Sequence, residues 1–116
     1  AVLRTDGIGS CLGIVIYSPL RKQGALAHIS GARGVKPSVR PENIVSTMLT
    51  CLDPHVQLGA YLTGEGLLGD NDMSTVVRQS LQEHAVPLLG MDLGGQKGRS
   101  MALYCDSGRV EVYNYL

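Results

Sequence analysis

Three residues in the first quarter of the chain have the types and spacing that nucleophilic catalysis requires. Cys11 follows a run of small residues that begins at Thr5, and it precedes the apolar, strand-like run 12–17. A thiolate at the mouth of a strand has an open approach and backbone N–H groups beside it. The alternative is that Cys11 is a small hydrophobic residue packed in the core, as many free cysteines are.

A histidine beside the cysteine favours the first interpretation. A cysteine at neutral pH is mostly thiol, and a neighbouring imidazole takes its proton or stabilises its thiolate. The apolar runs 12–17 and 24–29 predict an antiparallel hairpin that returns His28 to the side of Cys11. The register decides which face His28 occupies, because a shift of one residue turns its side chain over.

The same turn supplies supporting groups. The Thr5 hydroxyl is a candidate to fix the tautomer of the His28 ring. Backbone N–H groups of Gly9, Ser10 and Cys11 are candidates for an oxyanion hole. This set permits acyl transfer from an amide or an ester through a thioester intermediate.

The other two histidines are weaker candidates for a base. His84 lies in the last turn of a predicted helix, where a cation is simply favourable. His55 follows Cys51 at an i, i+4 spacing that suits a metal, but Pro54 breaks the helix between them and no second pair of ligands is obvious. No metal site is predicted.

Composition limits the class of protein. The 116 residues, of which 44% are hydrophobic and 17% charged, fit one globular domain over 1–116. The net charge is +0 and the Lys and Arg residues are scattered, which argues against nucleic acid as a partner. No apolar run has the length of a membrane span and no leader precedes the fold, so we expect a cytoplasmic protein. Three widely spaced cysteines favour reduced thiols.

Hydrophobic periodicity and turn residues predict seven short strands and two helices. The strands are expected at 1–3, 12–17, 24–29, 56–63, 86–91, 100–105 and 109–115, with 86–91 buried and Asp106-Ser107-Gly108 as a hairpin turn. One helix is expected over 41–52, with the inner face Ile44, Met48, Cys51 and Leu52. The other is expected over 73–83, with capping carboxylates at 70–72 and the inner face Met73, Val76, Val77, Ser80 and Leu81. These elements predict an α+β domain in which helices flank a layered β core of mixed sheets.

Two further segments are expected to be loops. The polar segment 30–39 is expected at the surface. The Gly-rich segment 92–99, which carries Lys97 and Arg99, lacks the residue order of a phosphate-binding loop and no helix follows it.

The chain resembles the CheD family, the chemoreceptor glutamine deamidases of bacterial and archaeal chemotaxis. The resemblance rests on Thr5-x-Gly7-x-Gly9-Ser10-Cys11 with its aliphatic strand, on His28, and on Asp92-x-Gly94-Gly95-x-x-Gly98-Arg99 before the last hairpin. Weaker similarities are Arg40, the turn 63–66 and Gly69. Together these motifs extend over nearly the whole chain.

The resemblance implies a cysteine hydrolase that converts receptor glutamines to glutamates and releases ammonia. Cys11 would be the nucleophile, His28 the general base and Thr5 the orienting residue. The implied fold is the layered β core with outer helices that the family shares with bacterial toxin deamidases. A chemoreceptor-like protein substrate and a CheC-type phosphatase partner are implied, without a cofactor.

The chain departs from the family pattern after His28, where Ile29-Ser30-Gly31-Ala32 follows, at Arg40 to Asn43, and at the start of the second helix. These departures bear on recognition of receptor and partner more than on the thiol chemistry. The alternative hypothesis is a catalytically silent binding module that docks a signalling protein. A redox sensor is a third hypothesis, although no cysteine nearby in sequence is placed to resolve an oxidised Cys11.

Overall fold

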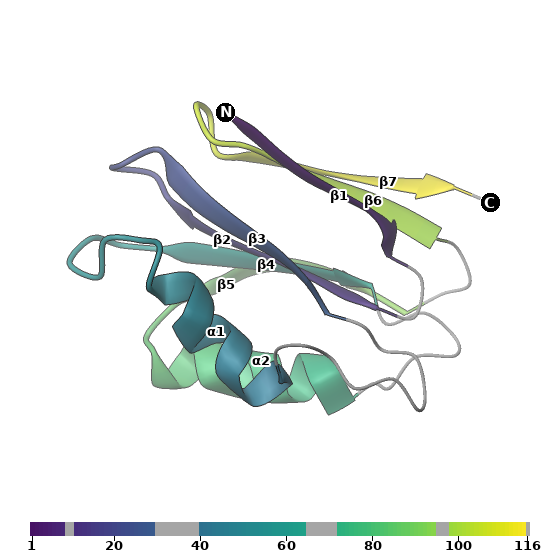
Figure 1. The fold of residues 1–116 in the computed structure, drawn as a ribbon, viewed down its shortest axis with the longest axis horizontal. Coiled ribbons are helices and arrows are strands. Elements are labelled where there is room, and N and C mark those ends of the chain that lie inside the picture. The colour runs from purple at the N-terminus through teal and green to yellow at the C-terminus, as the bar shows by residue number, and fades with distance from the viewer. Residues whose placement is uncertain (9–10, 30–39, 65–71, 95–97, 116) are drawn as a thin grey trace.

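Two β-sheets and a pair of helices stack in three layers (Figure 1). The computed structural model describes residues 1–8, 11–29, 40–64, 72–94 and 98–115. The elements are β1 (Val2–Ile8), β2 (Leu12–Ser18), β3 (Gln23–Ile29), α1 (Pro41–Leu49), β4 (Gly59–Gly64), α2 (Asp72–Glu83), β5 (Leu88–Leu93), β6 (Gly98–Tyr104) and β7 (Arg109–Tyr115). The predicted α+β class, with a layered β core flanked by helices, is confirmed.

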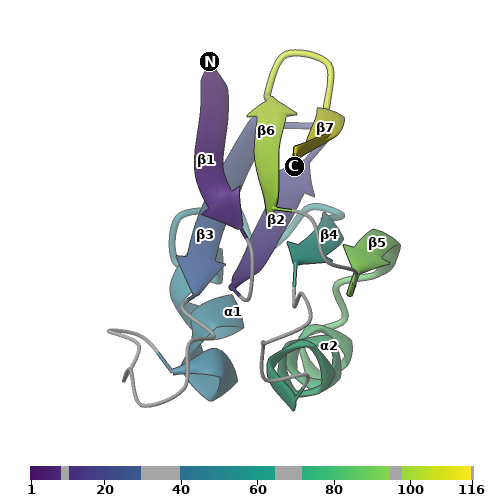
Figure 2. The same cartoon turned by 90° about the vertical axis from the view of Figure 1, so that its right-hand side faces the viewer.

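The strands form one three-stranded and one four-stranded sheet. The first has the order β1-β6-β7 and is antiparallel throughout. The second has the order β3-β2-β4-β5, in which β2 is antiparallel to both neighbours and β4 is parallel to β5. The smaller sheet lies over one face of the larger sheet, and the helices lie over the other (Figures 1 and 2).

Strand β2 lies at the centre of this stack, and all seven of its residues are buried. Successive side chains of a strand point to opposite faces, so β2 contributes to two cores. Ile14 and Ile16 belong to the core under the helices, while Val15 and Tyr17 pack toward β6 of the small sheet. This double burial explains why the run 12–17 is apolar without a polar alternation.

The two helices cover the large sheet with their apolar faces. Helix α1 begins with Pro41 at a position where the missing N–H costs nothing, and it buries Ile44, Val45 and Met48. Helix α2 buries Met73, Val77 and Leu81 against the same core. The inner face expected for α2 is confirmed, with Ser80 buried and Val76 half-buried. The expected capping carboxylates at 70–72 lie outside what the structure describes of the side chains.

Three expectations about the elements are wrong. Helix α1 ends at Leu49 rather than Leu52, so Cys51 lies in the following turn and is exposed instead of facing the core. Strand 86–91 is found two residues later, as the edge strand β5, with Leu89 and Met91 exposed. The first strand continues to Ile8 instead of ending at Leu3. Val2 to Thr5 pair with β6, and after a bulge Ile8 pairs with Arg99.

The last hairpin forms as predicted. Strands β6 and β7 pair from Gly98↔Tyr115 to Tyr104↔Arg109, and the turn closes through Gly108. Gly108 has a φ of 75°, and a Cβ there would come within 2.5 Å of the Tyr17 ring. A glycine is therefore required both by the backbone conformation and by the packing of this turn against β2.

Candidate active site

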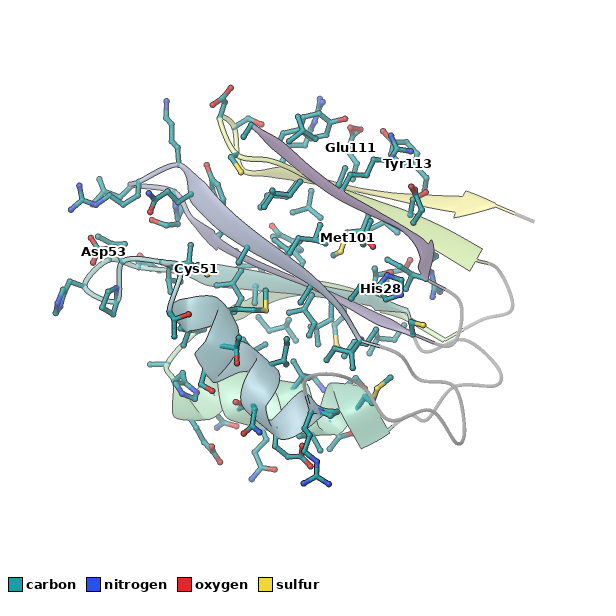
Figure 3. All side chains as sticks on the ribbon, viewed as in Figure 1. His28, Cys51, Asp53, Met101, Glu111 and Tyr113 are labelled. Carbon is teal, nitrogen blue, oxygen red and sulfur yellow. The ribbon has the colours of Figure 1, made fainter. Side chains whose placement is uncertain are left out.

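Thr5 and His28 meet between the two sheets. Thr5 lies on β1 and His28 on β3, and Thr5 Oγ1 is 2.8 Å from His28 Nδ1. Figure 3 shows the His28 ring between its own strand and the end of β1. The predicted pairing of these two residues is therefore present, although they come from strands of different sheets and are 23 residues apart.

The register of the β2–β3 pair fixes the face of His28. His28 is directly opposite Gly13, and Leu12 is opposite Ile29. A Cβ on Gly13 would lie 2.9 Å from Ile8 Cδ1 and 3.2 Å from Met101 Sδ, so this face of β2 looks toward the small sheet. His28 projects to the same side, because directly opposed residues share a face.

Cys11 lies in the bend immediately before β2 and is half-buried. It lies two residues before Gly13, the partner of His28, and one residue before Leu12, the first residue of β2 that pairs with β3, so Cys11 lies at the same end of this strand pair as His28. Gly13 has no side chain to fill the space between them. In the described part of the chain no hydrogen bond joins the thiol to the ring.

The Gly64 backbone closes against Cys11 from the other side. Gly64 is the last residue of β4 and pairs with Leu12. Its φ is 121°, and a Cβ there would overlap the carbonyl oxygen of Cys11 and lie 2.7 Å from Ile8 Cγ2. Only glycine allows β4 to end so close to the cysteine.

A buried arginine holds this end of β4. The Arg99 side chain is 6% exposed, and its Nη1 donates to the Gly64 carbonyl at 3.1 Å. Its Nη2 donates to the Gly94 carbonyl, and its Nε is 3.1 Å from Asp92 Oδ2. The sequence had suggested Arg99 only as part of a Gly-rich motif, and the structure places it inside the protein, paired with a carboxylate.

The other sequence candidates lie apart from these residues or outside the description. Gly9 and Ser10, the expected oxyanion groups, lie outside the described residues. His84 Nδ1 donates a hydrogen bond to the Ser80 carbonyl near the end of α2. The backbone N–H of His55 donates to Asp53. Among the described residues, no three His, Cys, Asp or Glu side chains gather as a metal would require.

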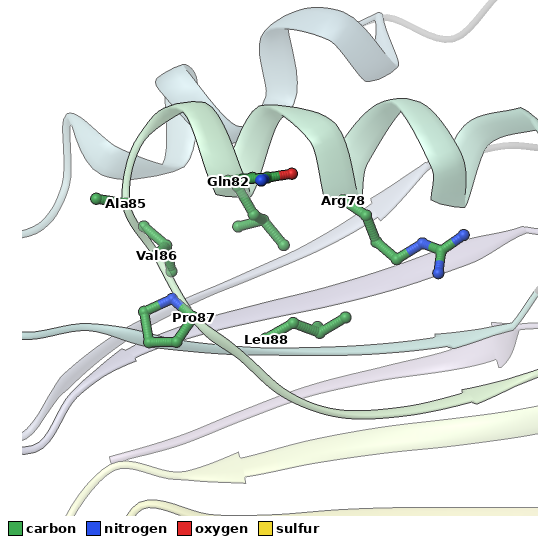
Figure 4. Close-up of a pocket in the computed structure, with 7 residues that line it drawn as sticks. Arg78, Gln82, Ala85, Val86, Pro87 and Leu88 are labelled. Atoms are coloured by element: carbon green, nitrogen blue, oxygen red, sulfur yellow. The ribbon is translucent and has the colours of Figure 1, made fainter.

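A surface pocket lies away from the cysteine, where α2 passes into β5. It has a volume of about 440 Å³ and its lining includes Arg78, Gln82 and Pro87 (Figure 4). None of the candidate catalytic residues lines it. Neither described helix has the length and apolar character needed to cross a bilayer.

Comparison with known proteins identifies the family, although no family model matches the chain. A probable chemoreceptor glutamine deamidase CheD of Moorella thermoacetica is 34% identical over 136 residues, covering 95% of this chain and 79% of the relative. One from Archaeoglobus fulgidus is 28% identical over 97% of this chain and 83% of its own length. The chemoreceptor glutamine deamidase CheD of Halalkalibacterium halodurans is 27% identical over 95% and 82%. This chain therefore belongs to the CheD family.

Proposed function

We propose that this chain is a protein-glutamine deamidase in which Cys11 is the nucleophile, His28 the general base and Thr5 the orienting residue. The observation that carries the proposal is the 2.8 Å hydrogen bond between Thr5 Oγ1 and His28 Nδ1. A hydrogen bond at Nδ1 holds the ring in one orientation and leaves Nε2 for proton transfer. The exposed position of His28 and the half-buried position of Cys11 leave room for a glutamine side chain to enter.

In the proposed reaction, Nε2 of His28 takes the proton from Cys11 Sγ, and the thiolate attacks the carbon of the substrate amide. The imidazolium returns the proton to the amide nitrogen as the C–N bond breaks, so that ammonia leaves and a thioester remains. Nε2 then takes a proton from water, whose oxygen attacks the thioester carbon. The C–S bond breaks, the imidazolium returns its proton to Cys11 Sγ, and glutamine has become glutamate.

Thr5 contributes to this cycle by choosing the tautomer. If Nδ1–H donates to Thr5 Oγ1, the lone pair lies on Nε2, where the base needs it. The protonated ring that forms after the first step can still donate to the same oxygen. The backbone N–H groups of Gly9 and Ser10 remain the predicted donors to the oxyanion of the tetrahedral intermediate.

The substrate that we propose is a chemoreceptor glutamine, because the relatives named above are chemoreceptor glutamine deamidases. A CheC-type phosphatase remains the proposed partner. A cytoplasmic location belongs to the same proposal, since a nucleophilic thiol must stay reduced. The described cysteines, Cys11, Cys51 and Cys105, are all free.

The test is to incubate the chain with a purified chemoreceptor cytoplasmic fragment and to follow ammonia release and the mass of each glutamine peptide. Cys11→Ser should abolish conversion, and His28→Ala should slow it by ~10²–10⁴-fold, the usual contribution of a general base. Cys51→Ser is the matched control, because Cys51 is exposed after α1 and should be dispensable.

The binding-module hypothesis makes the opposite prediction. In that case the wild-type chain would bind the fragment without converting any glutamine, and Cys11→Ser would bind equally well. Ammonia release that persists in Cys11→Ser would contradict the proposed mechanism directly.

A further inference from the structure

Arg99 is the one charged side chain that is buried among the residues the structure describes. Removing a guanidinium from water is costly, so a buried arginine is retained only when its donors are matched by acceptors. Its Nη1 and Nη2 donate to the carbonyls of Gly64 and Gly94, and the Asp92 carboxylate balances its charge as an ion pair 3.1 Å from Nε, without hydrogen-bond geometry. These acceptors show which part of the molecule the arginine organises.

The three partners of Arg99 all lie at the ends of two neighbouring strands. Gly64 is the last residue of β4, Asp92 belongs to β5, and Gly94 directly follows β5. Gly94 N also donates to the Gly64 carbonyl at 2.8 Å, so this oxygen receives two hydrogen bonds. The β4–β5 edge is therefore tied to β6, which belongs to the other sheet.

The backbone of Arg99 pairs with β1, the strand that precedes Cys11 in the chain. Arg99 pairs with Ile8, the last residue of β1, after a bulge between Thr5 and Ile8. Ile8 is fully buried, and its side chain also contacts the position of Gly64. Arg99 thus pairs with β1 through its backbone and holds the end of β4 through its side chain, and Gly64 at that end lies against the Cys11 carbonyl.

We propose that Arg99 is a positioning residue for Cys11: its guanidinium fixes the Gly64 peptide, and that peptide supports the carbonyl of Cys11. The link needs only two contacts, because Gly64 lies so close to this carbonyl that no side chain fits between them. The inference rests on the proposed function, in which Cys11 must be held within reach of His28.

Lysine cannot replace arginine in this role. The guanidinium is a planar fork whose two terminal nitrogens reach the Gly64 and Gly94 carbonyls at the same time, while a lysine ammonium is a single point charge. In Arg99→Lys, at least one of the Gly64 and Gly94 carbonyls loses its arginine donor, and a Gly64 carbonyl held by Gly94 N–H alone is fixed less firmly. A displacement of about 1 Å at a reacting group can cost about 100-fold in rate, so a clear loss is expected.

The three cysteines allow the test to be made within one protein. Iodoacetamide labelling of each cysteine is followed by peptide mass spectrometry over a range of pH. Cys51 is exposed and serves as the reference, and Cys105 is buried and reports unfolding. In Arg99→Lys we expect Cys11 to label about 10-fold more slowly than in the wild type at neutral pH, while Cys51 labels at the wild-type rate. Cys105 should stay protected.

Arg109→Lys is the matched control, because Arg109 lies on the adjacent strand β7, is exposed, and forms its ion pair with Glu111. It should keep the wild-type labelling profile of Cys11. In the deamidation assay Arg99→Lys should lower kcat and leave KM unchanged, since a buried side chain does not touch the substrate. Unchanged Cys11 labelling and kcat in a folded Arg99→Lys would overturn the inference.

A variant that does not fold is covered by a second substitution. If Cys105 becomes reactive in Arg99→Lys, the second variant is Asp92→Ala. It removes the ion-pair partner of Arg99, and the Asp92 side chain that is lost is 51% exposed. Slower labelling confined to Cys11 in that variant supports the inference, and an unchanged profile overturns it. Failure of the proposed function is separate, because it would appear as deamidation that persists in Cys11→Ser.

Discussion

Replacing Gly64 by alanine tests the close approach of β4 to the cysteine. The new Cβ would overlap the Cys11 carbonyl and lie 2.7 Å from Ile8 Cγ2, so backbone or a buried side chain must move. Overpacking of this kind costs ~1–3 kcal/mol. The φ of 121° adds a torsional cost of ~1–3 kcal/mol for a residue with a side chain. Together they predict a loss of ~2–6 kcal/mol in the free energy of unfolding.

Gly94→Ala separates the two contributions. Gly94 also has a positive φ, 82°, and its N–H donates to the Gly64 carbonyl, but a Cβ there would have no described atom within 4 Å. The free energy of unfolding of Gly94→Ala should fall by the torsional cost alone, ~1–2 kcal/mol for a left-handed residue. Urea unfolding of both variants gives the difference, and iodoacetamide labelling of the folded proteins should show slower Cys11 labelling only in Gly64→Ala. Equal losses of stability with equal Cys11 labelling would refute the steric argument.

Three other substitutions test the orientation of the base, an exposed tyrosine and the core. Thr5→Val should lower kcat for deamidation by about 10-fold or more, without a comparable fall in stability, because His28, the proposed base, loses its hydrogen-bond partner at Nδ1. The pKa of Tyr113 is raised to about 12, chiefly because its hydroxyl donates to Glu111 at 2.6 Å. Glu111→Gln should therefore lower the midpoint of the Tyr113 titration, measured by NMR of labelled tyrosine. Leu62→Ala should lower the free energy of unfolding by ~2–5 kcal/mol in urea, because Leu62 is 1% exposed under the helices.

The hairpins and the general class of the fold could be predicted because their signals are local. The turn Asp106-Ser107-Gly108 carries its own conformational preference, and the apolar run 12–17 reflects burial on both faces. The Thr5–His28 contact was also accessible, because an antiparallel hairpin returns His28 to the beginning of the chain. The register could not be derived, since two registers one residue apart fit the same apolar runs and only packing against Ile8 and Met101 selects one.

The ends of the elements and the role of Arg99 depend on contacts between distant segments. Helix periodicity placed Cys51 on the inner face of α1, but the helix ends two residues earlier. An arginine in a Gly-rich run has the same local pattern whether it faces solvent or a buried carbonyl. Its acceptor Gly64 is 35 residues away in sequence, so nothing near Arg99 indicates the contact.

The positions of β2 and β3 in the four-stranded sheet bear on how activity is lost on heating or in denaturant. Cys11 directly precedes β2, which is covered on both faces, whereas His28 is on β3, one of the two edge strands of that sheet. Edge segments open with a smaller free energy than central strands, and such openings occur while the rest of the molecule stays folded. Detachment of β3 would separate His28, the proposed base, from Cys11, the proposed nucleophile, so inactivation is expected to precede global unfolding.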